Sequence, residues 1–255
     1  MTRFFTLLFI LNCSFGAFCK PKPGFTYWLP KKIIEINEEH PEQQTTTTFG
    51  YDEHYRLLSI IRSNSYDHHI ATSFIKYNDR DRIAEITETS TNPAIPKSNF
   101  RFVYDEGNLI EIQMHKGEKF SKMQAQYNLQ HHSYLVTNDT NKSHFFLGEN
   151  NDLKTILVDD IKALEINTNS NLGLCKDIMV PTALTLIQDQ LQTTNSIGML
   201  FYQTREVTSI LYDGYQLVSE HQYDEYGNIV EVKLQNHPEG IFTYQIVYDH
   251  QNIKL

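Results

Sequence analysis

The 255-residue sequence is poor in cysteine and tryptophan, with three Cys and one Trp against 15 Tyr and 15 Phe. It has no run of five Lys or Arg, and 31 acidic residues outnumber 22 basic ones. Because a net charge of −9 gives no general attraction to phosphates, we expect no nucleic-acid partner. No segment approaches 18 consecutive apolar residues, so we expect no membrane-spanning helix. The length and aromatic content instead predict a folded chain with its own core.

Residues 1–19 have the order of an export signal. Arg3 is followed by an apolar run and then by small and polar residues, which is the layout of a secretory signal peptide. Cleavage is expected after Gly16 or after Cys19. The remaining chain, about 20–255, is expected to form one domain in the periplasm, at the outer-membrane surface or outside the cell.

The few cysteines point to export rather than to redox chemistry. Cys13 lies in the leader and Cys19 at its end. Neither follows the small residue that a lipidated cysteine requires, since Asn12 and Phe18 precede them, and this favours release over a lipid anchor. If cleavage follows Cys19, Cys175 is the last thiol and no intramolecular disulfide can form. We expect Cys175 to be buried and inert.

A short phrase recurs along the rest of the chain. It consists of an aromatic residue, Asp or Asn, two to four polar residues, and a Leu or Ile. The clearest copies are YDEGNLIEI from Tyr104 and YDEYGNIVEV from Tyr223. Where copies follow one another directly, the distance from one to the next is uneven, about 10 to 27 residues. Helical solenoids have a fixed period instead. Further copies begin at Tyr51, Tyr77, Tyr212 and Tyr248, with looser ones at Leu147 and Phe201.

Each phrase predicts a strand, a tight turn and a second strand. The Asp or Asn can hydrogen-bond its own backbone two residues on. Gly107 with Asn108, and Gly227 with Asn228, are expected to supply the positive φ of a primed hairpin turn. The phrase tyrosine is expected to pack over the next hairpin with its hydroxyl in water. The residues given this structural turn role are Tyr51, Asp52, Tyr77, Asn78, Tyr104, Asp105, Gly107, Asp213, Asp224, Gly227, Tyr248 and Asp249.

These phrases resemble the YD repeat, or RHS-type repeat, of bacterial cell-surface and toxin-shell proteins and of the animal teneurins. The resemblance runs from about residue 49 to 255, and is similar in scale to small exported YD-containing proteins of Bacteroidetes-type bacteria. It departs from the repeat pattern where Gly is missing from the copies at Tyr51, Tyr77 and Tyr248. The resemblance implies a repeatedly hairpinned antiparallel sheet with a role in display, encapsulation or binding, and implies no catalytic residue.

The turns predict an all-β fold, an antiparallel meander that forms one large curved sheet, a barrel or a sandwich. The opening hairpin is expected over 31–38 and 45–51. Between 167 and 195 the phrase is lost, which predicts an insertion or a seam. Within that break, Pro181 and the spacing of Leu184 and Leu191 predict a short helix near 181–191 that packs on the sheet.

Alternation along the strands predicts which side chains form the core. In FRFVY, Phe100, Phe102 and Tyr104 share one face. In FTYQIVY, one face carries Phe242, Tyr244, Ile246 and Tyr248. The opposite faces mix polar with apolar residues, as a solvated or lumen-facing surface would.

No catalytic, cofactor or metal motif is present. The sequence lacks HExxH, CxxC, GxSxG and GxGxxG. The tandem histidines, His68 with His69 and His131 with His132, would point to opposite faces of a strand and could not share a metal. The acidic runs at 78–81 and 138–141 lack the Gly and Glu of a calcium loop, which favours plain turns.

These observations predict an exported, non-enzymatic binding or structural module whose partner is a glycan or an envelope protein. Exposed tyrosines can stack on sugars or fill an interface, and the expected ligand surface consists of Tyr212, Tyr215, Tyr223 and Tyr226. Two alternatives stay open. One is an exported hydrolase with an acidic pair in the 167–195 break or a cleft. The other is a structural relative of an RHS-type shell.

Overall fold

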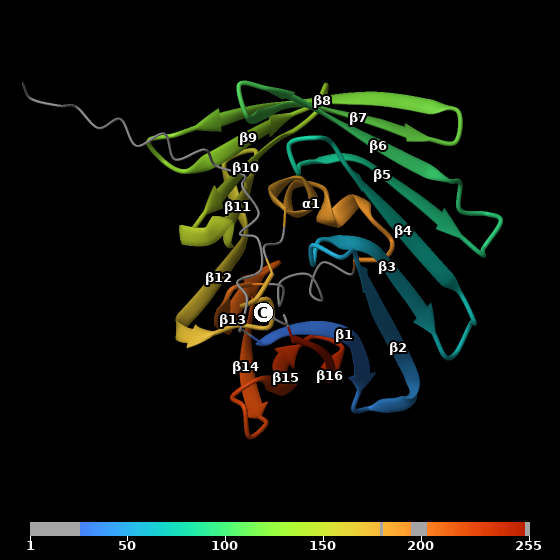
Figure 1. Ribbon diagram of the computed structural model, residues 1–255, viewed down its shortest axis with the longest axis vertical. Helices are drawn as coiled ribbons and strands as arrows, with labels where there is room; N and C mark the ends of the chain where they lie inside the picture. Colours follow the sequence, from blue (N-terminus) through green and yellow to red (C-terminus); the bar gives the residue numbers. More distant parts are fainter. Residues whose placement is uncertain (1–25, 179–180, 195–202, 253–255) are drawn as a thin grey trace, which may run out of the picture.

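A computed structural model describes residues 26–178, 181–194 and 203–252. Sixteen antiparallel strands in these residues form one closed barrel (Figure 1). The barrel closes where β1 pairs with β16, from Thr26 opposite Asn252 to Asn37 opposite Phe242. The all-β prediction is confirmed. Of the three predicted alternatives, a curved sheet, a barrel or a sandwich, the structure is the barrel. The leader, the start of the looser phrase copy at Phe201 and the chain end after 252 lie outside the described residues.

Every strand pairs with its sequence neighbours, so the topology is a plain up-and-down meander. The first eight strands are β1 (Thr26–Asn37), β2 (His40–Tyr51), β3 (Leu57–Asn64), β4 (Ile70–Tyr77), β5 (Ile83–Ser90), β6 (Ser98–Asp105), β7 (Asn108–Lys116) and β8 (Lys119–Asn128). The others are β9 (Ser133–Thr137), β10 (Lys142–Leu147), β11 (Leu153–Val158), β12 (Ile161–Leu172), β13 (Arg205–Tyr212), β14 (Tyr215–Tyr223), β15 (Ile229–His237) and β16 (Gly240–Asn252). The short helical elements are η1 (Glu149–Asn151), α1 (Thr182–Leu186) and η2 (Gln188–Gln190).

The inner face of the barrel is largely apolar, and the outer face mixes polar side chains with exposed apolar ones such as Phe74, Val103 and Val247. Phe100 and Tyr244 are buried in the core on the faces that alternation predicts. Outside, polar side chains bond across strands, as Asn99 Nδ2 does to Glu85 Oε1 at 2.5 Å and Gln124 Nε2 to Glu111 Oε2 at 3.0 Å. The outer face of the described strands therefore carries cross-strand polar pairs beside exposed apolar side chains.

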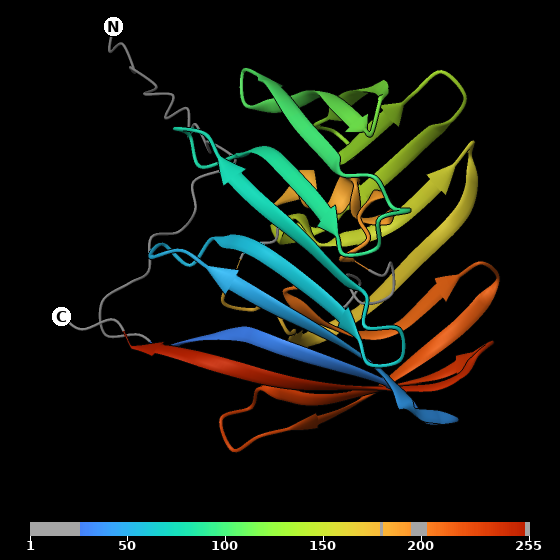
Figure 2. The same cartoon turned by 90° about the vertical axis from the view of Figure 1, so that its right-hand side faces the viewer.

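The described residues between β12 and β13 enter the barrel and occupy part of its lumen (Figure 1). A ring of sixteen strands is too wide for wall side chains alone to fill. Figures 1 and 2 show α1 inside the ring of strands. Leu184, Ile187 and Leu191 are at most 3% exposed and belong to the same core as the strands. The predicted helix is present but shorter than expected. We call residues 173–178, 181–194, 203 and 204 the plug.

Because neighbouring strands run in opposite directions, the turns alternate between two ends of the barrel (Figure 2). The turns that follow β2, β4, β6, β8, β10 and β14 share one end, which we call the Tyr-Asx mouth. The turns that follow β1, β3, β9, β11, β13 and β15 share the other end, which we call the cavity mouth. The ends of β12 and β13 that the plug connects also lie at the Tyr-Asx mouth.

Two local predictions are corrected by the backbone. In the turn between β6 and β7 the positive φ angles belong to Glu106 (43°) and Gly107 (104°), while Asn108 already pairs with Asp105. Among the described residues the tandem histidines lie at turns rather than inside strands. His68 has φ 54° before β4 and His132 has φ 46° before β9, because each hairpin needs a left-handed residue at that point.

Candidate functional site

The phrase copies collect at the Tyr-Asx mouth. Tyr51, Tyr77 and Tyr104 are separated by 26 and 27 residues, which is one strand down the barrel and one strand back. They therefore lie side by side at the same end. Tyr127 and Asn128, at the end of β8, form a further copy there that was not predicted. The Tyr-Asn pair itself is the feature of the sequence that could have revealed it. Tyr212 ends β13 at the cavity mouth, which explains its short spacing to the copy at Tyr223.

The Asp or Asn of the phrase holds the turn together. Asp52 Oδ1 accepts hydrogen bonds from the backbone N–H groups of His54 (2.8 Å) and Arg56 (2.9 Å). Asn78 Oδ1 repeats this arrangement with the N–H groups of Arg80 and Arg82, at 3.0 and 3.1 Å. The copy at Asp224 does the same for residues 226 and 228. The Asx side chain thus satisfies two backbone donors that the turn would otherwise leave open.

The phrase tyrosines point their hydroxyls inward to the previous hairpin. Tyr51 Oη donates to the carbonyl oxygen of Pro30 at 2.7 Å, and Tyr77 Oη donates to that of Leu57 at 2.9 Å. Tyr104 Oη donates to the carbonyl of Ile83 at 2.9 Å. The expectation that these hydroxyls reach into water is wrong, because the preceding strand places a backbone carbonyl within hydrogen-bond distance of each hydroxyl. Burial raises the pKa of Tyr77 and of Tyr104.

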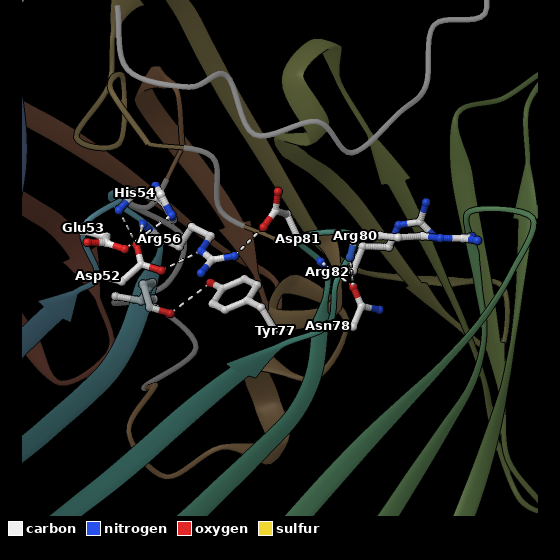
Figure 3. Close-up of polar contacts among 10 residues, drawn as sticks. Asp52, Glu53, His54, Arg56, Tyr77, Asn78, Arg80, Asp81 and Arg82 are labelled. Carbon is white, nitrogen blue, oxygen red and sulfur yellow. Dashed lines mark hydrogen bonds and ion pairs between the residues drawn. The ribbon is translucent and has the colours of Figure 1, made fainter.

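Arginine side chains connect successive turns (Figure 3). Arg56 Nε donates to Asp52 Oδ2 at 2.6 Å, and its Nη1 pairs with Asp81 of the next turn. The guanidinium also lies over the ring of Tyr77. Burial opposes ionisation of the Asp52 carboxyl, but the hydrogen bonds from Arg56 outweigh it and lower the pKa of Asp52. These contacts join the turn after β2 to the turn after β4.

Other phrase members take different positions. Asp213 has φ 47° in the turn between β13 and β14 at the cavity mouth. Asp249, on β16, has a carboxylate oxygen 3.9 Å from Lys31 Nζ. Tyr248 packs against the core, and burial raises its pKa. Gly227 has φ 76°, and Tyr55 and Asp81 adopt the same left-handed region in the copies that lack Gly.

The four tyrosines of the expected ligand surface lie at two ends of one hairpin. Tyr212 and Tyr215 pair across the turn at the cavity mouth. Tyr223 and Tyr226 lie at the Tyr-Asx mouth, where the ring of Tyr226 stacks on Trp28 with centroids 5.0 Å apart. The structure brings them together in pairs, not as one patch.

Tyr223 belongs to a cluster around the buried Glu206 carboxylate. Its hydroxyl donates to Glu206 Oε2, and Asn169 Nδ2 donates to Oε1 at 2.6 Å. His221 Nδ1 is 3.7 Å from the same carboxylate. Burial and the hydrogen bond to Glu206 raise the pKa of Tyr223 to about 12. All of these groups are engaged with one another, so the cluster stabilises the junction of β12, β13 and β14.

A cavity of about 520 Å³ lies inside the barrel between the plug and the strands β10 to β13 at the cavity mouth. Its polar lining comes from Arg62 on β3 and from Gln188, Asp189 and Gln192 on the plug, with Tyr212 at the edge. Its apolar lining comes from Phe145, Ile156, Leu164 and Leu191. We call it the lumen cavity.

Glu88 fixes the plug beside this cavity. The side chain, on β5, is 1% exposed, and its Oε1 accepts from the backbone N–H of Gln192 at 2.7 Å and of Thr193 at 3.1 Å. Ser73 and Thr193 share a hydroxyl hydrogen bond of 2.6 Å next to it. Burial raises the pKa of Glu88. Glu88, a residue of the barrel wall, thus holds the backbone of Gln192 in place, and the side chain of Gln192 lines the cavity.

The polar groups of the lumen cavity are only partly engaged. Gln192 Oε1 is buried without a hydrogen-bond partner among the described residues. Arg62 Nη2 is 3.9 Å from Glu35 Oε2, too far for a hydrogen bond. Asp189 Oδ2 accepts a hydrogen bond from Gln190 Nε2 at 3.1 Å. The cavity therefore offers an amide, a guanidinium and a carboxyl group to a molecule that enters it.

Three structural findings bear on the sequence predictions. Cys175 is buried, and burial raises its pKa. In residues 26–178, 181–194 and 203–252, no group of three His, Cys, Asp or Glu side chains is arranged to hold a metal ion. Within the same ranges, no helix has the length and apolar character needed to cross a membrane.

No protein-family description and no curated protein matches the chain. Similar solved structures include a porin-like protein from Bacteroides uniformis, at 13% identity over 86% of this chain and 96% of that one, with a TM-score of 0.38. Another is a porin-like protein from Bacteroides vulgatus, at 11% identity over 88% and 99%, with a TM-score of 0.47. The Tc holotoxin pore of Photorhabdus luminescens matches at 10% identity over 80% of this chain and 9% of that one, with a TM-score of 0.19. No residue role is transferred from these structures.

Proposed function

We propose that this chain is an exported, non-enzymatic binding module that holds a saccharide in the lumen cavity. The observation that carries the proposal is the pairing of an apolar wall with convergent, incompletely paired polar groups in one cavity. Ligand sites commonly occupy 300 to 1,000 Å³ and combine these two kinds of lining, and the lumen cavity measures about 520 Å³.

The lining suits a sugar ring better than an apolar ligand. Gln188 and Gln192 offer amide groups that both donate and accept hydrogen bonds, and Arg62 and Asp189 add a strong donor and a strong acceptor. Tyr212 and Phe145 supply aromatic surface for the apolar face of the ring. An apolar ligand would leave the guanidinium of Arg62, which is too far from Glu35 to donate to it, without an acceptor, at a cost of about 1 to 3 kcal/mol.

Export and membership of the YD-repeat class are part of the same proposal. The leader supports export, and the cross-strand polar pairs on the outer wall support a barrel that stands in water, in the periplasm or outside the cell. The recurring Tyr-Asx turns support a YD-type architecture. In this architecture the phrase closes a rim, while ligand binding takes place at the opposite mouth.

The experiment is a glycan array probed with the chain from residue 20, followed by calorimetric titration of the saccharide that gives the strongest signal. Tyr212→Ala and Gln192→Leu should each weaken binding about tenfold, since each removes about 1 to 2 kcal/mol of contact. Tyr215→Ala is the matched control, because Tyr215 pairs with Tyr212 across the hairpin but does not line the cavity.

A blank array, or equal effects of the Tyr212 and Tyr215 variants, would rule out the lumen cavity as the site. Loss of binding in Tyr226→Ala alone would place the ligand at the Tyr-Asx end of the hairpin. Recovery of the bound oligosaccharide intact after long incubation separates a binding module from the hydrolase alternative.

A further inference from the structure

A second, smaller cavity of about 110 Å³ lies at the Tyr-Asx mouth. Arg82 lines it together with Tyr127, Tyr134, Asn108 and Asn151, and the start of α1 closes one side. It shares no lining residue with the lumen cavity. We call it the Arg82 cavity.

Arg82 occupies the phrase position of Arg56 but lacks its carboxylate. Asp52 uses Oδ1 for the turn N–H groups and Oδ2 for Arg56 Nε. Asn78 Oδ1 accepts hydrogen bonds from the turn N–H groups, as Asp52 Oδ1 does. The other end of the Asn78 side chain is an NH₂ donor, which cannot accept a hydrogen bond from a guanidinium. Arg82 consequently makes no ion pair with any carboxylate whose side chain the structure describes.

The surroundings of Arg82 leave its donors open to the cavity. The guanidinium carbon lies 5.4 Å from the ring centroid of Tyr104, so one face of the group is covered. Nη2 lies 3.2 Å from the position that a Cβ on Gly107 would take, so the guanidinium rests against that backbone. Asp81 also lines the cavity, but its carboxylate pairs with Arg56.

Two tyrosine hydroxyls add donors on the same cavity. Burial raises the pKa of Tyr134, so its hydroxyl keeps the proton that it can donate. The hydroxyl of Tyr127 makes no hydrogen bond to a described residue. Arg82, Tyr127 and Tyr134 therefore present donors to one small space.

We propose that the Arg82 cavity binds one small oxyanion group, a carboxylate or a phosphate. The guanidinium fork matches such groups in two parallel hydrogen bonds. At about 110 Å³ the cavity is smaller than the 300 Å³ at which sites for whole organic ligands begin, so an ion or a single charged group fits it. This inference goes beyond the proposed saccharide site and stands independently of it.

The test is titration of the chain from residue 20 with sodium acetate and with inorganic phosphate, at constant ionic strength, followed by calorimetry and by chemical shifts of the tyrosine rings. Arg82→Gln should weaken the tighter of the two probes about 10- to 100-fold, as expected for a charge-assisted hydrogen bond. Arg80→Gln is the control, because it removes the same charge from an exposed neighbour that does not line the cavity.

Asn78→Asp gives a second test that does not remove the arginine. The new carboxylate should pair with Arg82 as Asp52 pairs with Arg56, and should weaken anion binding at least about tenfold with no loss of thermal stability. If Arg82→Gln does not fold, this variant decides the question. Unchanged affinity in Asn78→Asp, equal losses in Arg80→Gln and Arg82→Gln, or no saturable binding of either probe would overturn the proposal.

A third probe, glucuronate, distinguishes a free ion from a charged group on a larger ligand. If glucuronate binds more tightly than acetate and this advantage disappears in Arg82→Gln, the cavity anchors the acidic group of a larger molecule. If the two bind equally and both depend on Arg82, the site takes a free anion. Neither result depends on the Tyr212 and Gln192 variants that test the lumen cavity.

Discussion

The guanidinium of Arg56 lies over the ring of Tyr77, with its carbon 4.7 Å from the ring centroid. The two residues belong to successive turns of the Tyr-Asx mouth, so this contact joins one hairpin to the next. Such a cation–π contact contributes about 0.5 to 2 kcal/mol. Tyr77 also donates its hydroxyl to the Leu57 carbonyl directly after the Arg56 turn. The recurring phrase thus stabilises the barrel rim by linking neighbouring hairpins.

Replacing Tyr77 with Phe should lower the free energy of unfolding by about 1 kcal/mol, because the Leu57 carbonyl loses its donor while the ring and its contact with Arg56 remain. Urea denaturation of both proteins measures the difference. Tyr66→Phe is the control, since the Tyr66 ring is 57% exposed. Equal stability of Tyr77→Phe and the wild type would show that this hydroxyl contributes nothing to the rim.

Replacing Glu88 with Gln should make the protein less sensitive to rising pH. Burial raises the folded-state pKa of Glu88 above its ordinary value of 4.5, so the folded state holds the proton more tightly than the unfolded state. Wild-type stability is therefore highest below pH 4.5 with respect to this group and falls as pH rises through the folded pKa. Each unit of pKa corresponds to about 1.4 kcal/mol.

Glu85→Gln on the same strand provides the opposite sign. The side-chain hydrogen bond from Asn99 lowers the pKa of Glu85, so its contribution is present above pH 4.5 and is lost as pH falls. Thermal unfolding of the three proteins between about pH 3 and pH 8 should show diverging difference curves. Parallel curves for the two variants would contradict the assignment of Glu88 to a buried position against the plug.

Gly173→Ala should be much more destabilising than Gly227→Ala. A Cβ on Gly173 would lie 2.3 Å from the carbonyl oxygen of Gln203, so the plug backbone must move, and we expect a loss of at least about 3 kcal/mol. Gly227 has φ +76° with open space around it, and only left-handed strain of about 1 kcal/mol applies. Chemical denaturation gives both values, and equal losses would show that the plug entry is not tightly packed.

The single tryptophan reports on the Tyr-Asx mouth. The ring of Trp28 stacks on Tyr226, which is 64% exposed, so Tyr226→Ala should expose the indole and shift its fluorescence to longer wavelength. The expected change in stability is below about 1 kcal/mol, since Tyr226 is a surface residue. Tyr215→Ala, at the cavity mouth, should leave the emission unchanged. A shift in both variants would contradict the separation of these tyrosines.

Local features of this protein followed from sequence because they depend on neighbouring residues. Alternation placed Phe100 and Tyr244 in the core, and the spacing of Leu184 and Leu191 predicted a helix that packs on the sheet. The Tyr-Asx phrase predicted turns because an Asx side chain bonds its own backbone. Tyr51, Tyr77, Tyr104 and Tyr127 are each separated by two strands, and this spacing alone places them at the same end of the sheet.

Contacts across the barrel were decided by the tertiary structure alone. Closure of β1 on β16 depends on the accumulated twist and stagger of every strand, which no short segment encodes. The lumen cavity joins Arg62 to Gln192, 130 positions away, and Arg82 gains its cavity from β7, β8, β9 and the plug. The sequence by itself determined a hairpinned all-β chain with an aromatic core. The enclosed volume, and the side chains that converge in it, arose only when the ring of strands closed around its own connecting segment.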